Sequence, residues 1–209
     1  MERRKALKNI GLGSAALFTS SALFGALQGC SPSAPEVGWI PVFFTPAEAA
    51  QMEKICEAIA PKTDTPGAKE AGVVNHLDQA LKVLYKERDS DYFRRGLAAF
   101  VKSYDDNQET SFNKATTEQV TGVINDFMID FEKDGAKSKT YYESLQDENS
   151  EKSDDFVMTY FTINVVPATF RSYFTSEIVG ETVMRYDPIP TKYEGCIPYA
   201  PGEHSWASV

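Results

Sequence analysis

The 209-residue sequence has few of the side chains that most metal-dependent or cofactor-dependent enzymes use. It holds three cysteines and two histidines, His76 and His204. It has no C-x-x-C or C-x-x-C-H pair, which excludes the ordinary zinc and haem sites, and two histidines are too few for a histidine-based metal site. The Walker and G-x-S-x-G patterns are also absent, so no motif indicates a P-loop NTPase or a serine hydrolase.

Basic charge is scarce as well. The chain has 21 lysines and arginines against 30 aspartates and glutamates. Residues 1–29 hold four of the basic residues and one of the acidic ones, so the rest carries 17 basic and 29 acidic residues, a formal charge of −12. This balance argues against nucleic acid as a partner and against a polybasic membrane contact. The length that follows residue 29 suits one domain with one core.

The first thirty residues predict an export signal. Arg3 and Arg4 precede a spacer and a lysine, in the order of a twin-arginine signal, and no charge follows from Ile10 to Leu27. Leu27-Gln28-Gly29-Cys30 resembles a lipobox, in which Cys30 is acylated and becomes the new N-terminus. A transmembrane anchor is the alternative, but the uncharged run of about 18 residues is short for a span and is diluted by glycine and serine.

These features predict a protein on the periplasmic side of a bacterial membrane, held there by a lipid. Residues 1–29 are the signal peptide, residues 30–44 a tether, residues 45–185 a helical domain and residues 186–209 a C-terminal arm. The twin-arginine route carries folded proteins, often with a partner or cofactor already bound. We therefore expect this chain to assemble with something in the cytoplasm.

The predicted fold class is all-α, a small bundle of about five helices with an extended proline-rich C-terminal arm. The first helix begins at Thr45, with Pro46 at its first position and Glu48 three residues after the cap, and ends at Pro61. Apolar spacing predicts a second helix that places Val74, Leu77, Leu81, Leu84 and Tyr85 on one face, a third over about Ser90 to Tyr104, and a fourth from Thr116 to Gly135.

The polar, acidic residues 134–153 are predicted to be a surface excursion, after which Ser153 caps a fifth helix. Pro167 should kink or break that helix, with a short helical piece from Thr169 to Val179 beyond it. Residues 186–209 contain too many prolines for a helix or a central strand, and too much apolar surface for a free tail. The arm should therefore lie against its own helices or against a partner.

The sequence offers little for catalysis. The paired carboxylates Asp105-Asp106 and Asp154-Asp155 are better explained by helix capping and solvation than by acid–base work. We predict no catalytic, cofactor-binding or metal-binding residue in this chain. If Cys30 carries lipid, Cys56 and Cys196 can pair with each other, pair with a partner's cysteine or stay free.

Two blocks of sequence carry a resemblance to a known family. The first is Ile55 to Val74, which contains the turn-rich run Pro61-Lys62-Thr63-Asp64-Thr65-Pro66-Gly67-Ala68, and the second runs from Tyr186 to Pro198. They resemble the opening and closing blocks of the gluconate 2-dehydrogenase subunit 3 family, the small subunits of FAD-dependent sugar and alcohol dehydrogenases. The resemblance implies a large flavoprotein subunit of the glucose–methanol–choline type that holds the FAD and is exported on this chain's signal. It also implies that a cytochrome c subunit often accepts the electrons.

The resemblance gives the arm a role, which is to wrap the flavoprotein while the helices supply a rigid platform. Proline lowers the entropy lost when an extended segment docks, and aromatic side chains are the usual hot spots. The arm residues expected to bind the partner are Tyr186, Pro188, Pro190, Tyr193, Cys196, Tyr199 and Trp206. Cys196 would form a disulfide with Cys56 or with a partner's cysteine. The alternatives are a free-standing periplasmic lipoprotein that binds or supports something else, and an enzyme that uses the acidic pairs.

Overall fold

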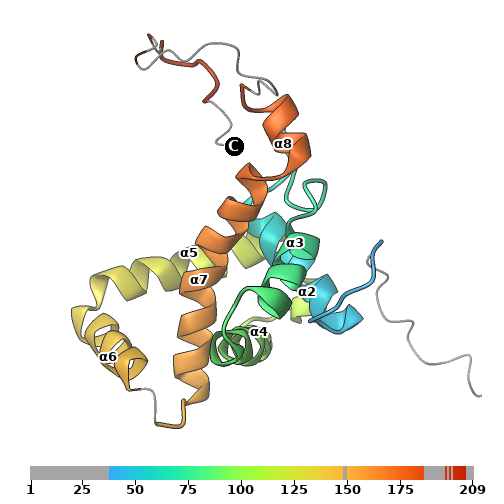
Figure 1. The fold of residues 1–209 in the computed structure, drawn as a ribbon. Helices are drawn as coiled ribbons and strands as arrows, with labels where there is room; N and C mark the ends of the chain where they lie inside the picture. The colour runs from blue at the N-terminus through green and yellow to red at the C-terminus, as the bar shows by residue number, and fades with distance from the viewer. Residues whose placement is uncertain (1–37, 148–149, 186–195, 197, 199, 206–209) are drawn as a thin grey trace, which may run out of the picture. The chain divides into compact units, whose positions relative to one another are not determined.

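The computed structural model describes residues 38–147, 150–185, 196, 198 and 200–205. Helices are the regular structure of this part of the chain, which confirms the all-α prediction (Figure 1). In chain order they are α2 (Pro46–Ile59), α3 (Val73–Val83), α4 (Glu87–Asn107), the short 3-10 helix η1 (Phe112–Lys114), α5 (Thr117–Lys133), α6 (Gly135–Gln146), α7 (Asp154–Phe174) and α8 (Glu177–Thr182).

Local sequence signals set the starts of several helices. The Thr45 side chain accepts a hydrogen bond from the backbone of Glu48, whose carboxylate accepts one from the backbone of Thr45. Thr116 and Gln119 repeat this capping box at the start of α5. Ser153 caps α7 with a single side-chain bond. These caps satisfy backbone N–H groups that the first turn of a helix leaves without partners, so the starts predicted at Thr45, Thr116 and Ser153 are confirmed.

The two longest helices, α4 and α7, cross at very close range at Gly96. A Cβ atom on Gly96 would lie 2.2 Å from the carbonyl oxygen of Val157 and 2.4 Å from the Cβ of Phe161. Only glycine permits this approach, which brings the ring of Phe93 to 5.0 Å from that of Phe161, centroid to centroid. The contact makes α4 and α7 the rigid centre of the fold.

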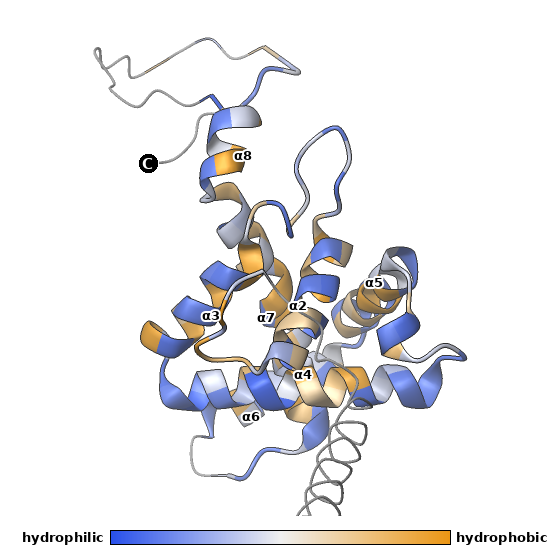
Figure 2. Ribbon diagram, turned by 90° about the vertical axis from the view of Figure 1, so that its right-hand side faces the viewer, coloured by the Kyte–Doolittle hydropathy of each residue, from blue (hydrophilic) through white to orange (hydrophobic). Residues whose placement is uncertain are grey.

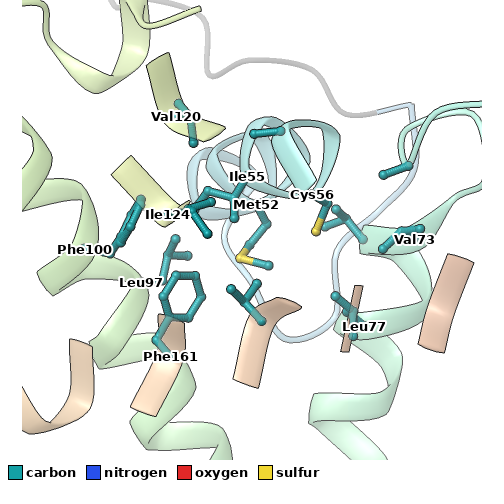
Figure 3. Packing of buried hydrophobic residues seen from close by; sticks show 14 of the residues in the cluster. Met52, Ile55, Cys56, Val73, Leu77, Leu97, Phe100, Val120, Ile124 and Phe161 are labelled. Atoms are coloured by element: carbon teal, nitrogen blue, oxygen red, sulfur yellow. The ribbon is translucent and has the colours of Figure 1, made fainter. Parts of the chain in front are cut away.

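The main core fills the space between this helix pair and α2, α3 and α5. In Figure 3, side chains of α2 point toward those of α4, α5 and α7 on one side and α3 on the other. The members labelled there are Met52, Ile55, Cys56, Val73, Leu77, Leu97, Phe100, Val120, Ile124 and Phe161. One continuous apolar cluster therefore joins helices that lie far apart in sequence, as a single domain requires.

Residues 134–153 lie mostly at the surface, as predicted, but Gly135–Gln146 within them forms α6, a helix that was not predicted from the sequence. Asp134 ends α5, and its side chain accepts hydrogen bonds from the backbone N–H groups of Ala136 and Lys137, at 3.1 and 3.0 Å. A glycine after a helix usually marks a stop, but here the aspartate before it caps the next helix. Tyr141 then packs α6 onto the second, smaller apolar cluster between Phe131 and Phe156.

Of the predicted kink or break at Pro167, the break is wrong, because α7 continues through it to Phe174. Proline cannot donate to the carbonyl four residues earlier, but Pro167 lies on the exposed side of α7, where water can reach that carbonyl. The buried positions Val165 and Thr169 on either side hold the helix in place. Tertiary packing thus outweighs the local cost of the proline.

Leu84 and Tyr85 do not lie on the buried face predicted for the second helix. The helix ends at Val83, and Leu84 and Tyr85 are exposed in the turn that follows. Helical periodicity places a side chain on a face only while the helix continues. Val74, Leu77 and Leu81, which precede the end, are buried as predicted.

Candidate docking surface for a partner protein

Three exposed apolar side chains follow one another along the end of α7 and the start of α8. Phe170, Phe174 and Ile178 are 39%, 48% and 38% exposed. The rings of Phe170 and Phe174 stack on each other, with centroids 6.2 Å apart and planes 18° apart. We call these three residues the α7–α8 stripe. A group of exposed apolar side chains of this size on adjacent elements is typical of an interaction site.

The opposite side of the same segment is firmly anchored. The Tyr173 hydroxyl donates a hydrogen bond to the carbonyl of Pro66 at 2.7 Å, and the Thr169 hydroxyl donates one to the Cys56 sulfur at 3.4 Å. Val179 on α8 is completely buried. The stripe is therefore presented by a segment that is fixed to the core, which lowers the entropy that docking would cost.

The loop that anchors Tyr173 belongs to the first sequence block, Ile55 to Val74. Glu57 holds this loop with both carboxylate oxygens, which accept the backbone N–H groups of Lys62 and Lys69 at 3.0 and 2.9 Å. A Cβ on Gly67 would lie 2.3 Å from one of these oxygens and 2.8 Å from the backbone nitrogen of Lys62. The block thus forms a compact loop, closed around the Glu57 carboxylate, that supports the end of α7.

Surface ion pairs add to this loop. Lys62 pairs with Glu70, and the Lys69 ammonium lies 3.0 Å from Glu53. Both lysines are largely exposed, so each pair contributes little to stability. Asp64 is exposed in the middle of the loop.

The arm returns to the end of α8. The backbone N–H of Arg185 donates to the carbonyl of Ser205 at 2.8 Å, and the Arg185 guanidinium lies 3.6 Å from the Glu203 carboxylate. Gly202 adopts a φ of +92°, which favours glycine, in the turn that leads into this contact. The described residues 203–205 of the arm thus lie beside Arg185, the last residue before the arm.

Most of the arm residues predicted to bind a partner lie outside the described residues, namely Tyr186, Pro188, Pro190, Tyr193, Tyr199 and Trp206. Arg3, Arg4 and Cys30 lie outside them too. Cys196 is described and is exposed, as is His204.

The two described cysteines are free and lie in contrasting surroundings. Cys56 is completely buried, and this burial raises the pKa of its thiol to about 12, with Glu53 and Glu57 acting in the same direction. Cys196 is exposed. A disulfide between them would require one of the two sulfurs to change its surroundings. The pairing stays a prediction.

The acidic pairs weighed for catalysis have structural surroundings. Asp105 accepts the backbone N–H of Phe112 at 2.6 Å and thereby holds η1 to the end of α4. Asp154 and Asp155 occupy the first turn of α7, where negative charge favours the helix dipole. His76 is exposed on α3. In the part of the chain that the structure describes, no three or more His, Cys, Asp or Glu side chains gather in a group that could hold a metal ion.

Two hollows lie beside α6. One, of about 500 Å³, lies between α6 and α7 and is lined by Tyr141, Phe156 and Asp155 among others. The other, of about 410 Å³, is lined by Tyr160, Tyr142 and Asn164 among others. Burial raises the pKa of Tyr141 to about 12 and also raises that of Tyr160. At neutral pH both phenols keep their protons, so neither can serve as a base.

Sequence reasoning missed several charged residues that hold the backbone together. The buried Lys152 ammonium donates to the carbonyl of Ser144 at 2.6 Å near the end of α6. Lys54 donates to three carbonyls, those of Phe112, Asn113 and Ala115, at 2.9 to 3.1 Å, and burial lowers its pKa. Such lysines leave no clear sequence signal, because the carbonyls they bind belong to other segments.

Asp78 is the missed residue with the clearest role, since it fixes the segment that leads from the tether into the domain. Its carboxylate is completely buried and accepts the backbone N–H groups of Val42, Phe43 and Phe44, at 2.6, 2.9 and 2.7 Å. Arg94 completes the arrangement by donating to the Phe43 carbonyl, with its guanidinium 4.2 Å from the Phe43 ring centroid. The position of Asp78 among the apolar residues Val74, Leu77 and Leu81 was the signal that could have identified it.

Comparison with known proteins gives one match. No curated protein and no solved structure matches the chain. The model of the family described as gluconate 2-dehydrogenase subunit 3 matches residues 46–191, from the first position of α2 through α8 and into the arm. The match spans well over half of the sequence and confirms the resemblance drawn from the two blocks. The chain therefore belongs to the gluconate 2-dehydrogenase subunit 3 family, whose name makes its members accessory subunits of a dehydrogenase.

Proposed function

We propose that this chain is a non-catalytic small subunit that binds the flavoprotein subunit of a sugar or alcohol dehydrogenase and exports it on its own twin-arginine signal. The observation that carries the proposal is the α7–α8 stripe, an exposed apolar group on a rigid segment inside the part of the chain that defines the family. The FAD belongs to the flavoprotein of the glucose–methanol–choline type, and this chain holds no cofactor of its own. A cytochrome c subunit completes the electron path in such a complex.

The stripe suits a protein partner for physical reasons. Stacked phenylalanines offer a large apolar area with few rotatable bonds, and truncation of a hot-spot side chain that fills a pocket costs roughly 2 kcal/mol or more of binding free energy. Arg185 and Glu203 form an ion pair at 3.6 Å beyond the end of α8, so charged groups follow the stripe along the chain. A polar rim around an apolar centre is the usual composition of a protein interface.

The proposal includes the arm as a second part of the interface. Its tyrosines and prolines, which are Tyr186, Pro188, Pro190, Tyr193 and Tyr199, together with Trp206, would add contacts once the stripe has docked. Cys196 is exposed and could form a disulfide with a cysteine of the flavoprotein. The stripe and the arm would thus act as one interface, in which the rigid part sets the orientation and the arm adds area.

The location proposed for the complex follows from the N-terminal residues. Arg3 and Arg4 direct the folded complex to the twin-arginine route, and Cys30 carries the lipid that holds it on the periplasmic side of the membrane. The proposal explains why the twin-arginine route is used, because the flavoprotein must bind FAD and fold before it crosses the membrane.

The test is a pull-down of the full chain from its native host through a C-terminal tag, with an absorbance spectrum of the eluate. The wild-type chain should bring down a yellow complex with a large flavoprotein. Phe174→Glu should lose most of this partner, whereas Ile129→Glu, which changes an exposed apolar residue on α5, should keep it. A chain that lacks residues 186–209 should also lose the partner while its helices stay folded.

Two results would contradict the proposal. A colourless single band from the wild-type chain would indicate a free-standing lipoprotein. Equal recovery of the flavoprotein with Phe174→Glu and Ile129→Glu would show that the stripe is not the docking surface, even if the partner is correct.

A further inference from the structure

The turn between α3 and α4 exposes a compact apolar group between two lysines. Val83 and Leu84 are 76% and 77% exposed and Tyr85 is 39% exposed, while Lys82 and Lys86 on either side are also exposed. We call residues 82–86 the α3–α4 tip. In Figure 2 the end of α3 stands out in orange at the edge of the molecule. Such exposure is costly in water and calls for a surface that covers it.

The tip is a rigid turn. The backbone N–H groups of Leu84 and Tyr85 both donate to the carbonyl of Ala80, at 2.8 and 3.2 Å. The buried Ser90 hydroxyl donates to the carbonyl of Leu81 at 2.7 Å and ties the start of α4 to the end of α3. The apolar side chains are therefore held outward by the backbone and cannot turn into the core.

The tether approaches the body along the same helix. Gly38 and Trp39 line a hollow with Val74 and Asn75 near the start of α3, and the Asp78 carboxylate then binds the backbone from Val42 to Phe44. Ile40, in between, is 90% exposed. Gly38 follows Cys30 by eight positions, and eight residues reach at most about 28 Å when fully extended. A lipid on Cys30 would therefore keep the start of α3 within about 28 Å of the membrane, and the tip lies at the other end of this 11-residue helix, about 16 Å along it.

From these observations we infer that the α3–α4 tip is a membrane-contact surface, in which Val83 and Leu84 enter the boundary between the headgroups and the acyl chains. Tyr85 suits the interface because it combines an apolar ring with a polar hydroxyl, and Lys82 and Lys86 would meet lipid phosphates. None of the helices in the described ranges is long and apolar enough to cross a bilayer, so the contact is interfacial.

The contact would supply what a lipid anchor alone cannot. A flexible tether restrains the distance of the domain from the membrane but leaves its orientation free. A rigid tip that enters the interface fixes the orientation, and with it the direction in which a bound partner faces. The acidic charge of the chain opposes a purely electrostatic contact, so the apolar side chains must provide most of the attraction.

The inference goes beyond the proposed partner role and rests on the proposed lipid at Cys30. It is tested with the full chain in vesicles of phosphatidylethanolamine and phosphatidylglycerol, with and without brominated acyl chains, which quench tryptophan. The two native tryptophans are replaced by Trp39→Phe and Trp206→Phe. Leu84→Trp then reports on the tip, and Ile129→Trp on α5 is the matched control at an exposed apolar position.

We expect brominated lipid to remove most of the emission of Leu84→Trp and little of that of Ile129→Trp. Lys82→Glu with Lys86→Glu should weaken the quenching of Leu84→Trp. Equal quenching at the two positions, or none at position 84, would overturn the inference. So would loss of the quenching when the dehydrogenase partner binds, because the tip would then be a protein contact.

Flotation of the same vesicles separates this inference from the anchor. Vesicles that float with the protein but do not quench Leu84→Trp would leave the lipid anchor standing and refute the tip contact. Protein that neither floats nor is quenched refutes both. The pull-down that tests the partner role is independent of either result.

Discussion

The close crossing of α4 and α7 gives the sharpest test of the fold, through the substitution Gly96→Ala. The added Cβ would lie 2.2 Å from the Val157 carbonyl oxygen and 2.4 Å from the Cβ of Phe161. Neither neighbour can rotate away, since one is backbone and the other is the first atom of a side chain. The two helices would have to separate by about 1 Å, and a gap of that size forfeits roughly a quarter to a half of the attraction across it.

The expected cost follows from two opposing effects. Overpacking of a core usually costs about 1–3 kcal/mol, and this contact is at the severe end. Alanine is better than glycine inside a helix by about 1 kcal/mol, which offsets part of the cost. We therefore expect Gly96→Ala to lower the free energy of unfolding by about 2 kcal/mol, as measured by urea denaturation followed by circular dichroism.

Gly122→Ala is the matched control. Gly122 lies inside α5, and a Cβ there would meet nothing within 4 Å. The same substitution should raise the free energy of unfolding by up to about 1 kcal/mol. If Gly96→Ala were as stable as Gly122→Ala, the helices would not cross as closely as described, and the reasoning would fail.

The remaining predictions concern buried charge and the thiols. Asp78→Asn should lower the free energy of unfolding by about 2–4 kcal/mol in thermal or urea melts, because an amide cannot accept three backbone N–H groups. The control, Asp106→Asn at an exposed site, should change it little. In the native protein Cys196 should react with iodoacetamide at pH 8 and Cys56 should not, and both should react in urea; rapid native labelling of Cys56 would contradict its burial. Burial raises the pKa of the Cys56 thiol to about 12 in the folded chain, whereas the value in the unfolded chain is near 9. Below pH 9 the thiol keeps its proton in both states. As pH rises from 9 to 12 the unfolded chain loses the proton first, so the free energy of unfolding falls by about 1.4 kcal/mol per pH unit. Between pH 9 and 12 the free energy of unfolding should fall less with pH for Cys56→Ala than for the wild type. An equal fall in both proteins would show that Cys56 is not the cause.

The starts of the helices could be predicted because their signals are local. A capping box such as Thr45 with Glu48 involves residues three positions apart, and apolar spacing such as Val74, Leu77 and Leu81 shows the buried face of a helix directly. The helix α5 stops beside Gly135 as predicted, and the new helix after it depends on a second local signal that was overlooked, whereas at Pro167 a local signal for a break met a stronger tertiary effect. Asp134 caps the new helix, and the packing of Val165 and Thr169 carries α7 past its proline.

The candidate docking surface could be predicted only in part. The sequence directed attention to the arm, because a proline-rich run with many aromatics is conspicuous. It gave no reason to separate Phe170 and Phe174 from the other aromatics of α7, such as Phe161 and Tyr173. Which of these point outward depends on where α4 and the 61–68 loop cover α7. That arrangement brings together segments about 70 to 110 residues apart.

By itself, the sequence determined that the chain is helical, where its main helices begin and to which family it belongs, because these properties rest on neighbouring residues and on two continuous blocks. Only the tertiary structure decided that Glu57, Asp78 and Lys152 hold backbone groups of other segments, and that the α7–α8 stripe and the α3–α4 tip stay exposed. The physical reason is that burial and hydrogen bonding of a side chain depend on what covers it. That covering comes from residues that are distant in sequence and meet only when the chain folds.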